Sequence, residues 1–211
     1  MSRGAGSAPA ESASDFVTKL ATVPIARAPP GIHDPWPCDH AGRTINHPVS
    51  DLTSAPLPPV GPDDHVRGPD GAPLVIVYGD YECPFCAAAE VRLHAREVRV
   101  VFRHFPIRSS HPRAPAAAHA AEAAADQGAF WEMHDLLFAD QGRLEDPHLW
   151  DRAQRLGLDV ERFDADRRSD RIAKRVKAQF HGGVRAGVAT TPTIFVNDER
   201  YSGRTAVSMW T

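Results

Sequence analysis

The chain has 211 residues, of which 42% are hydrophobic and 24% are charged, and its formal net charge is −3. This composition is typical of one globular domain with material left for a tail. The weak negative charge gives no electrostatic reason to expect nucleic acid or an anionic membrane as a partner. No stretch reaches the roughly 18 consecutive apolar residues of a transmembrane helix, so we also expect no membrane span.

Residues 1–62 differ from the rest of the chain. They hold 11 of the 19 prolines and show little helical or strand periodicity, which favours an extended or partly disordered segment. Residues 1–28 lack the unbroken apolar core of a secretory signal, because Asp15 and Lys19 interrupt it. We therefore expect a cytoplasmic protein in which residues 63–211 form the folded domain.

The N-terminal segment also carries several side chains that can bind metals. Their spacing matches no zinc module, so we interpret them as a chance cluster and expect neither a metal nor another cofactor. A third redox thiol at Cys38 is the alternative. The side chains are those of His33, Cys38, Asp39, His40 and His47.

A C-x-x-C motif at Cys83 and Cys86 is the strongest chemical signal in the sequence. The apolar, β-branched run at residues 74–78 before it predicts a strand buried on both faces, and residues 87–93 after it favour a helix. Cys83 would then lie at a helix N-terminus, where free N–H groups and the helix dipole stabilise a thiolate. This predicts Cys83 as the attacking sulfur and Cys86 as the more buried, resolving thiol.

The same spacing also occurs in zinc sites. A structural zinc needs four ligands, however, and Cys38 is the only other cysteine. The sequence therefore favours a redox-active dithiol over half of a metal site.

Three motifs carry a resemblance to a known family. They are GDYECPFC at residues 79–86, VVFRHFP at residues 100–106 and TTPTIFVN at residues 190–197. Together they resemble the DsbA-like branch of the thioredoxin superfamily, and in particular the cytosolic thioredoxin-like domains found alone or fused behind sodium/proton antiporters. The resemblance covers about residues 60–203 and implies an α/β thioredoxin fold with an inserted helical subdomain.

The resemblance also implies a substrate-binding surface. A cis-proline loop at Thr191 and Pro192 would face the dithiol, and its backbone would pair with an extended substrate segment. Pro84 and Phe85, between the two cysteines, would complete that surface. The alternative for Pro192 is an ordinary trans proline that leads into a strand.

Proton transfer to and from Cys86 needs a proton acceptor. Many members of the superfamily that the motifs resemble carry a buried acidic residue six positions before the first cysteine. Here that position is Val77, and the nearest carboxylates are Asp80 and Glu82. Either could assist deprotonation through water, although both could also lie on a solvated strand end, which we favour for Glu82. His104 and His111 could stabilise the thiolate, but we do not assign them a catalytic role.

Helical patterns fill the region between the two halves of this site, which predicts an insertion at about residues 113–186. We expect helices at residues 114–127 and 129–139, one starting at Pro147, one capped by Asp159, and one capped by Ser169 that stops near Gly182 and Gly183. A strand at residues 193–196, a turn at Asn197–Asp198, a partner strand at residues 200–202 and a short helix at residues 205–210 follow.

These features predict a thiol–disulfide oxidoreductase that acts on protein or low-molecular-weight disulfides and is recycled by a cellular reductant. In the reducing cytosol a reductase or a redox relay is favoured over an oxidase. The alternatives are a non-catalytic redox-sensing or interaction domain and a thiol-cofactor-dependent transferase or isomerase. Trp210 could pack onto a neighbouring chain, so a homodimer is an open expectation.

Overall fold

The computed structural model describes residues 54–209, which form one compact unit. The expectations for Cys38, for the histidines near it and for Trp210 lie outside these residues.

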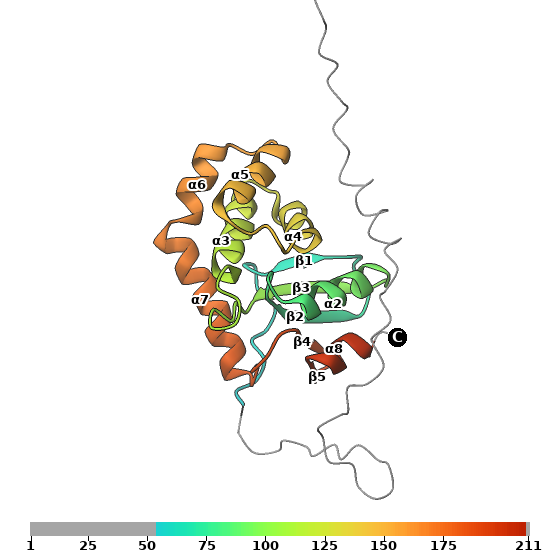
Figure 1. The fold of residues 1–211 in the computed structure, drawn as a ribbon. Coiled ribbons are helices and arrows are strands. Elements are labelled where there is room, and N and C mark those ends of the chain that lie inside the picture. The colour runs from blue at the N-terminus through green and yellow to red at the C-terminus, as the bar shows by residue number, and fades with distance from the viewer. Residues whose placement is uncertain (1–53, 210–211) are drawn as a thin grey trace, which may run out of the picture. The chain divides into compact units, whose positions relative to one another are not determined.

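A five-stranded sheet forms the centre of the unit (Figure 1). Its strands lie in the order β1-β3-β2-β4-β5, with β2 and β3 parallel and every other neighbouring pair antiparallel. Their bounds are His65–Arg67 (β1), Leu74–Gly79 (β2), Arg99–His104 (β3), Thr193–Val196 (β4) and Glu199–Ser202 (β5). The sequence analysis predicted strands at the positions of β2, β4 and β5, but not the short strand β1.

The helices divide into two groups. Helix α2 connects β2 to β3 and packs against α8, while α3 to α7 lie together beside one end of the sheet (Figure 1). Their bounds are Pro84–His94 (α2), Ala114–Ala125 (α3), Phe130–Ala139 (α4), Asp146–Arg155 (α5), Val160–Arg167 (α6), Asp170–Arg185 (α7) and Arg204–Ser208 (α8). All of α3 to α7 therefore lie between β3 and β4 in the chain.

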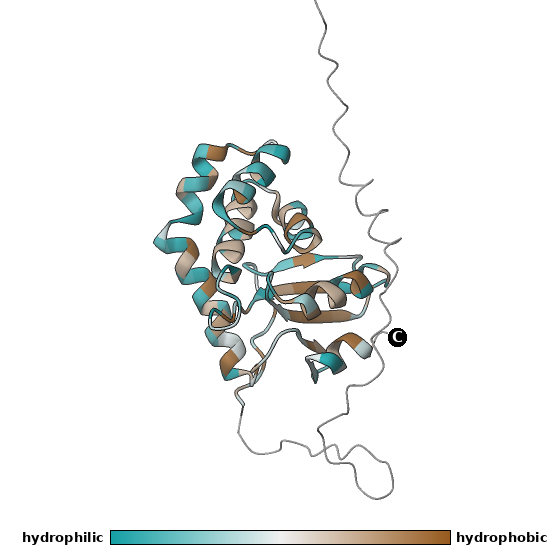
Figure 2. Cartoon of the chain, in the orientation of Figure 1, coloured by the Kyte–Doolittle hydropathy of each residue, from teal (hydrophilic) through white to brown (hydrophobic). Residues whose placement is uncertain are grey.

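The sheet buries apolar side chains on both faces, as the continuous apolar run of β2 predicted. Val75 and Val77 face one core with α2, α3 and α4, whereas Ile76 and Tyr78 face a second core with Phe180 of α7. Figure 2 shows the central strands as the most hydrophobic part of the ribbon. Because a shift by one residue would move each side chain to the opposite face, this alternation fixes the register of β2 in the sheet. The register determines where β2 ends and where the dithiol loop starts.

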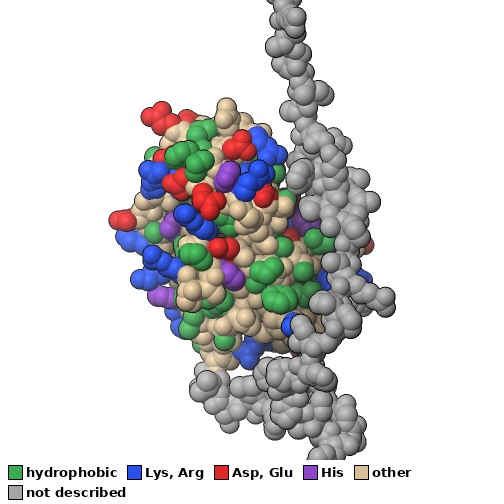
Figure 3. All heavy atoms as spheres, in the orientation of Figure 1, with side chains coloured by type: hydrophobic (Ala, Val, Ile, Leu, Met, Phe, Trp, Pro, Cys, Tyr) green, Lys and Arg blue, Asp and Glu red, His purple; other side chains and the backbone are tan. Residues whose placement is uncertain are grey.

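Helix α3 forms the centre of the helical insertion. Its alanines are almost completely buried, and α4, α5, α6 and α7 all pack against it. Alanine has the highest helix propensity and no side chain beyond Cβ, so neighbouring helices approach closely. The outer surface is charged: Figure 3 shows acidic and basic side chains mixed over these helices. The ion pairs there include those of Arg168 with Asp146 and Asp164.

Helix α7 does not stop near Gly182 and Gly183, as the sequence had predicted, but continues to Arg185. Gly183 is needed inside the helix because a Cβ atom there would lie 2.8 Å from the ring of Tyr78 and 2.9 Å from that of Phe105. The glycine thus permits α7 to approach β2. Helix α5 also begins at Asp146 rather than at Pro147, with Glu145 as its N-cap.

The extended residues before β1 are held by Arg103 of β3. This side chain is buried, forms a bidentate pair with Asp64, and donates to the carbonyl oxygens of Pro58 and Pro59 at 2.9 and 3.1 Å. A buried guanidinium needs such partners to offset its loss of hydration. Arg103 therefore fastens the start of the described chain to the sheet.

Candidate functional site

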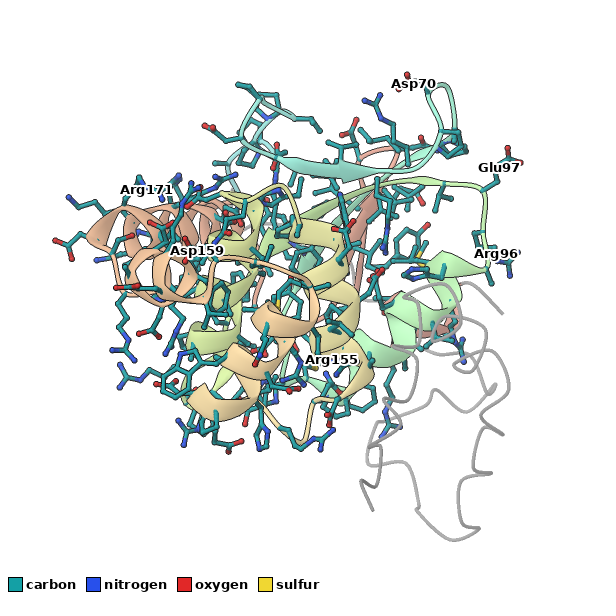
Figure 4. The ribbon with its side chains drawn as sticks, turned by 90° about the horizontal axis from the view of Figure 1, so that it is seen from above. Asp70, Arg96, Glu97, Arg155, Asp159 and Arg171 are labelled. Atoms are coloured by element: carbon teal, nitrogen blue, oxygen red, sulfur yellow. The ribbon has the colours of Figure 1, made fainter. Side chains whose placement is uncertain are left out.

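The dithiol lies at the carboxyl end of β2. Cys83 is the N-cap of α2, Pro84 is in its first turn, and the Cys83 carbonyl oxygen accepts hydrogen bonds from the N–H groups of Cys86 and Ala87 at 3.0 and 3.3 Å. A proline fits this position because the first helical N–H groups have no partner inside the helix. The loops with Asp70, Arg96 and Glu97 lie at the opposite end of the sheet (Figure 4).

The environment of Cys83 favours its thiolate. A hydrogen bond from the Cys86 thiol contributes most to lowering the pKa of Cys83, burial opposes it, and Thr191 and the backbone N–H groups of Cys86 and Phe85 contribute further. Together they lower the pKa of Cys83 to about 6, against about 8.5 for a free cysteine. At neutral pH most of the Cys83 sulfur is therefore ionised.

Cys86 has the opposite character, although both thiols are free and buried. Burial is the main reason why the pKa of Cys86 is raised well above its usual value, and the hydrogen bond and charge of Cys83 add to this effect. Cys86 thus keeps its proton and donates to its neighbour. The pKa values of the two thiols are therefore shifted in opposite directions.

The cis-proline motif at residues 190–197 lies beside the dithiol, although the helical insertion separates the two in the sequence. The Thr191–Pro192 peptide bond is cis, and the Cys83 Sγ lies 3.4 Å from the Thr191 carbonyl oxygen, to which the thiol form donates. The buried Thr191 hydroxyl has no hydrogen-bond partner among residues 54–209. It becomes a donor when Cys83 ionises, which explains why Thr191 lowers the pKa of Cys83.

An exposed rim surrounds the buried sulfurs. Pro84, Phe85, Ala189 and Thr190 are exposed, whereas Cys83 itself is 4% exposed. Phe85 is 45% exposed, which is unusual for a phenylalanine. The Cys83 sulfur is therefore buried next to an exposed rim that includes the apolar ring of Phe85.

Asp80 is completely buried, so the solvated strand end that the sequence left open as an alternative is wrong for this residue. Its Oδ1 accepts from the Glu82 N–H at 2.9 Å, and its Oδ2 accepts from the Ile107 N–H at 2.8 Å and lies 2.9 Å from His111 Nδ1. Asp80 acts on Cys86 in two opposing ways: a hydrogen bond with its backbone lowers the pKa of that thiol, and its charge raises it. Asp80 thus lies between Cys86 and the partly exposed His111.

Glu82 and His104 contact groups other than the sulfurs. Glu82 Oε2 accepts from the N–H groups of Arg113 and Ala114 at 2.6 and 3.0 Å, and so supplies the start of α3 with an acceptor. His104 is buried and its Nε2 lies 3.0 Å from Glu122. Burial lowers the pKa of His104, so the permanent charge paired with Glu122 is that of Arg175, whose Nε lies 3.0 Å away.

A second buried polar cluster extends from the residue two positions before Cys83. The Tyr81 hydroxyl lies 3.0 Å from His134 Nδ1, the His134 Nε2 lies 3.0 Å from Glu90, and Arg67 bridges Glu90 and Asp135 at 2.8 and 2.7 Å. Within residues 54–209, Glu90, His134 and Asp135 are the only close group of three potential metal ligands. Arg67 already supplies their counter-charge. Sequence patterns did not reveal this cluster, because its members come from four separate elements.

The family model Thioredoxin_4, described as thioredoxin, matches residues 61–211. The chain therefore belongs to the thioredoxin family. This membership agrees with the α/β fold, the helical insertion and the DsbA-like resemblance that the sequence motifs implied.

Curated relatives of this thioredoxin-family chain carry the names of transporters. It is 49% identical over 152 residues to the Na(+)/H(+) antiporter NhaA 1 of Salinispora arenicola. The matched region covers 69% of this chain but only 23% of that relative. It is 44% identical over 163 residues to the Na(+)/H(+) antiporter NhaA of Herminiimonas arsenicoxydans, with 74% and 26% covered. The chain thus spans about a quarter of the length of these relatives. Within residues 54–209, no helix has the length and apolarity that crossing a membrane requires.

Solved structures show the same fold. A thioredoxin-like oxidoreductase from Silicibacter pomeroyi DSS-3 superposes with a TM-score of 0.61 at 26% identity and covers 71% of this chain and 92% of that structure. The thiol–disulfide exchange protein alpha-DsbA2 from Wolbachia pipientis has a TM-score of 0.59 at 20% identity, with 68% and 81% covered. The chain therefore has the fold of DsbA-type oxidoreductases.

Proposed function

We propose that this protein is a thiol–disulfide oxidoreductase that exchanges disulfides through Cys83 and Cys86. The proposal depends on one observation above all: the Cys83 sulfur, whose pKa is lowered to about 6, lies at the N-terminus of α2 and 3.4 Å from the carbonyl oxygen that precedes the cis-proline. This arrangement presents a nucleophile beside backbone groups that an extended substrate can pair with.

The reaction has two steps. The Cys83 thiolate attacks one sulfur of a substrate disulfide, forms a mixed disulfide and releases the other sulfur as a thiolate. The Cys86 sulfur then gives up its proton and attacks Cys83 Sγ, which closes the Cys83–Cys86 disulfide and releases the second substrate thiolate. The substrate gains two electrons and the protein dithiol loses two, so a cellular reductant must restore it.

Each neighbouring residue has a role in this proposal. Thr191 and Pro192 orient the substrate segment, while Pro84 and Phe85 form the apolar rim that it crosses. Asp80 accepts the Cys86 proton, because it is the buried carboxylate whose charge acts on that thiol. Glu82, which binds the start of α3, serves the fold instead.

We place the protein in the cytoplasm as a reductase or redox relay acting on protein or low-molecular-weight disulfides. A Cys83 pKa of about 6 lies between those of thioredoxin, about 7, and DsbA, about 3.5. Because a more stable thiolate makes the disulfide more oxidising, this intermediate value favours a relay over a strong oxidant.

The proposal is tested by supplying the reduced protein with oxidised glutathione or a disulfide-bonded peptide. Wild type should complete the exchange, Cys86→Ser should stop at the mixed disulfide, and Cys83→Ser should not react. Cys38→Ser is the control and should behave as wild type. Full turnover by Cys83→Ser would contradict the proposal, and mass spectrometry of the quenched protein distinguishes these states.

The antiporter relatives favour a second candidate function. A domain that is 44–49% identical to one quarter of a sodium/proton antiporter could report the redox state of the dithiol to a membrane partner. That role predicts slow turnover with small disulfides and a complex whose affinity changes when Cys83 and Cys86 are oxidised. The exchange assay separates the candidates once a thiol reductant such as dithiothreitol is added in excess, since a catalyst must then turn over repeatedly.

A further inference from the structure

Gln141 connects the helical insertion to the dithiol loop. It lies in the connection between α4 and α5, and its side-chain Nε2 donates to the Tyr81 carbonyl oxygen and to the Cys83 carbonyl oxygen, both at 2.9 Å. The amide group thus uses both hydrogens on the backbone that carries the attacking sulfur. Among the described residues, no other residue of the insertion forms a hydrogen bond with the Cys83 backbone.

The Tyr81 carbonyl group depends on Gln141 for its donor, whereas the Cys83 carbonyl also accepts from the N–H groups of Cys86 and Ala87. Tyr81 is 1% exposed, and its carbonyl oxygen accepts from no other group among residues 54–209. The Cys83 carbonyl oxygen closes the first turn of α2, so its direction fixes how the helix N-terminus lies under the sulfur. A buried carbonyl without a partner costs about 1–3 kcal/mol, and the loop would move to avoid that cost.

The position of Gln141 is itself fixed from inside the insertion. Arg152 of α5 is 3% exposed and donates to the carbonyl oxygens of Asp140 at 2.9 Å and Arg143 at 2.7 Å, on either side of Gln141. The same guanidinium donates to the carbonyl oxygens of Leu136 and His148. A planar, buried guanidinium with four backbone partners holds this connection in one conformation.

We propose that Gln141 is a positioning residue for the dithiol, whose amide group holds the Tyr81 and Cys83 carbonyls and thereby sets the orientation of the α2 N-terminus beneath the Cys83 sulfur. The inference depends on the proposed thiol–disulfide exchange. It assigns the insertion a part in the reactivity of Cys83, in addition to covering the site. The N–H groups also offset the negative carbonyl ends closest to the sulfur, which favours the thiolate.

The test replaces Gln141 with methionine, which has a similar length and no donor. The rate of Cys83 alkylation by iodoacetamide is measured against pH on the reduced full-length chain, and the Cys83 peptide is quantified by mass spectrometry. We expect Gln141→Met to raise the midpoint of this profile by roughly half a pH unit, which corresponds to about a twofold smaller thiolate fraction near pH 6. An unchanged midpoint would overturn the inference.

Gln127 supplies a matched control. Its side chain also makes two backbone hydrogen bonds, to the carbonyl and N–H of Asp159 at 3.1 and 2.9 Å, but it joins two parts of the insertion away from the sulfurs. Gln127→Met should lower thermal stability and leave the alkylation midpoint unchanged. If Gln127→Met shifts the midpoint as much as Gln141→Met, the effect is general loosening and the inference is wrong.

Gln141→Lys keeps N–H donors at this position and covers the case in which the methionine variant does not fold. Its midpoint should stay at or below that of wild type, whereas a rise would overturn the inference. Failure of the proposed function has a different signature: a wild-type midpoint near 8.5 would show that Cys83 is not activated at all.

Discussion

At the scale of single residues, the two sulfurs acquire opposite properties from their neighbours. Cys86, Thr191 and the N–H groups at the start of α2 lower the pKa of Cys83, whereas burial and the charge of Cys83 raise that of Cys86. A hydrogen bond donated to a thiolate lowers the pKa of the thiol, and burial without such a bond raises it. A pair of chemically identical side chains therefore becomes one nucleophile and one proton donor.

Replacing Thr191 with valine should raise the pKa of Cys83 by roughly half a unit to one unit. The change removes the buried hydroxyl that gains a partner when the sulfur ionises, and it keeps the shape of the side chain. The ultraviolet absorbance of the thiolate, measured against pH, gives the pKa directly. Thr191→Ser retains the hydroxyl and should remain close to wild type; equal values for the two variants would disprove this role of the hydroxyl.

Replacing Asp80 with asparagine should slow the second step of exchange by roughly tenfold to a hundredfold and leave the first step nearly unchanged. The amide cannot accept the Cys86 proton, and general acid–base groups contribute on this order. Single-turnover measurement of the mixed-disulfide lifetime reports the effect. Glu82→Gln is the matched control, because Glu82 binds the α3 start: it should alter stability and not this lifetime.

At the scale of elements, the sequence predicted those parts whose signals are local. The buried run of β2, the caps Asp159 and Ser169, and the Asn197–Asp198 turn are all as predicted, with the cap oxygens accepting from the N–H groups of Arg162 and Ile172 and both turn residues at positive φ. Each of these features depends on a few neighbouring residues. The local sequence was therefore sufficient to predict these features.

The features that the sequence did not reveal depend on tertiary contacts. Strand β1 has three residues and exists because it pairs with β3, and α7 continues through two glycines because Gly183 packs against Tyr78. The candidate site divides in the same way. The cysteines and Pro192 are visible as motifs, and His111 was named from the sequence although its contact with Asp80 was not, whereas Gln141 reaches the site from another segment of the chain without a motif of its own.

The two adjacent glycines of α7 give a prediction for this element. Gly183→Ala should destabilise the protein by about 1–3 kcal/mol, because the added methyl group overlaps the rings of Tyr78 and Phe105. Gly182→Ala places its Cβ 3.6 Å from Pro58, an ordinary contact, and alanine is the better helix former by about 1 kcal/mol. Urea unfolding of both variants should therefore give changes of opposite sign, and a stabilising Gly183→Ala would contradict the packing described here.

At the scale of the whole molecule, the activated thiol connects redox state to stability. An acidic group whose pKa is lower in the folded than in the unfolded state stabilises the fold at high pH and loses that effect as the pH falls. For Cys83 the folded value is about 6 and the unfolded value is about 8.5, so the stabilisation is complete above the unfolded value and is lost as the pH falls through the folded one. It exists only in the reduced protein, since the disulfide does not titrate.

The free energy of unfolding of the reduced protein should accordingly rise between pH 6 and about pH 8.5 relative to Cys83→Ser, with a slope of at most about 1.4 kcal/mol per pH unit. Subtracting the serine variant removes the titration of the carboxylates and histidines, which are common to both chains, and serine itself does not ionise in this range. Above this window the raised pKa of Cys86 acts in the opposite direction and limits the gain. Denaturant unfolding at successive pH values measures the difference, and a curve parallel to that of Cys83→Ser would mean that the folded chain does not stabilise the Cys83 thiolate.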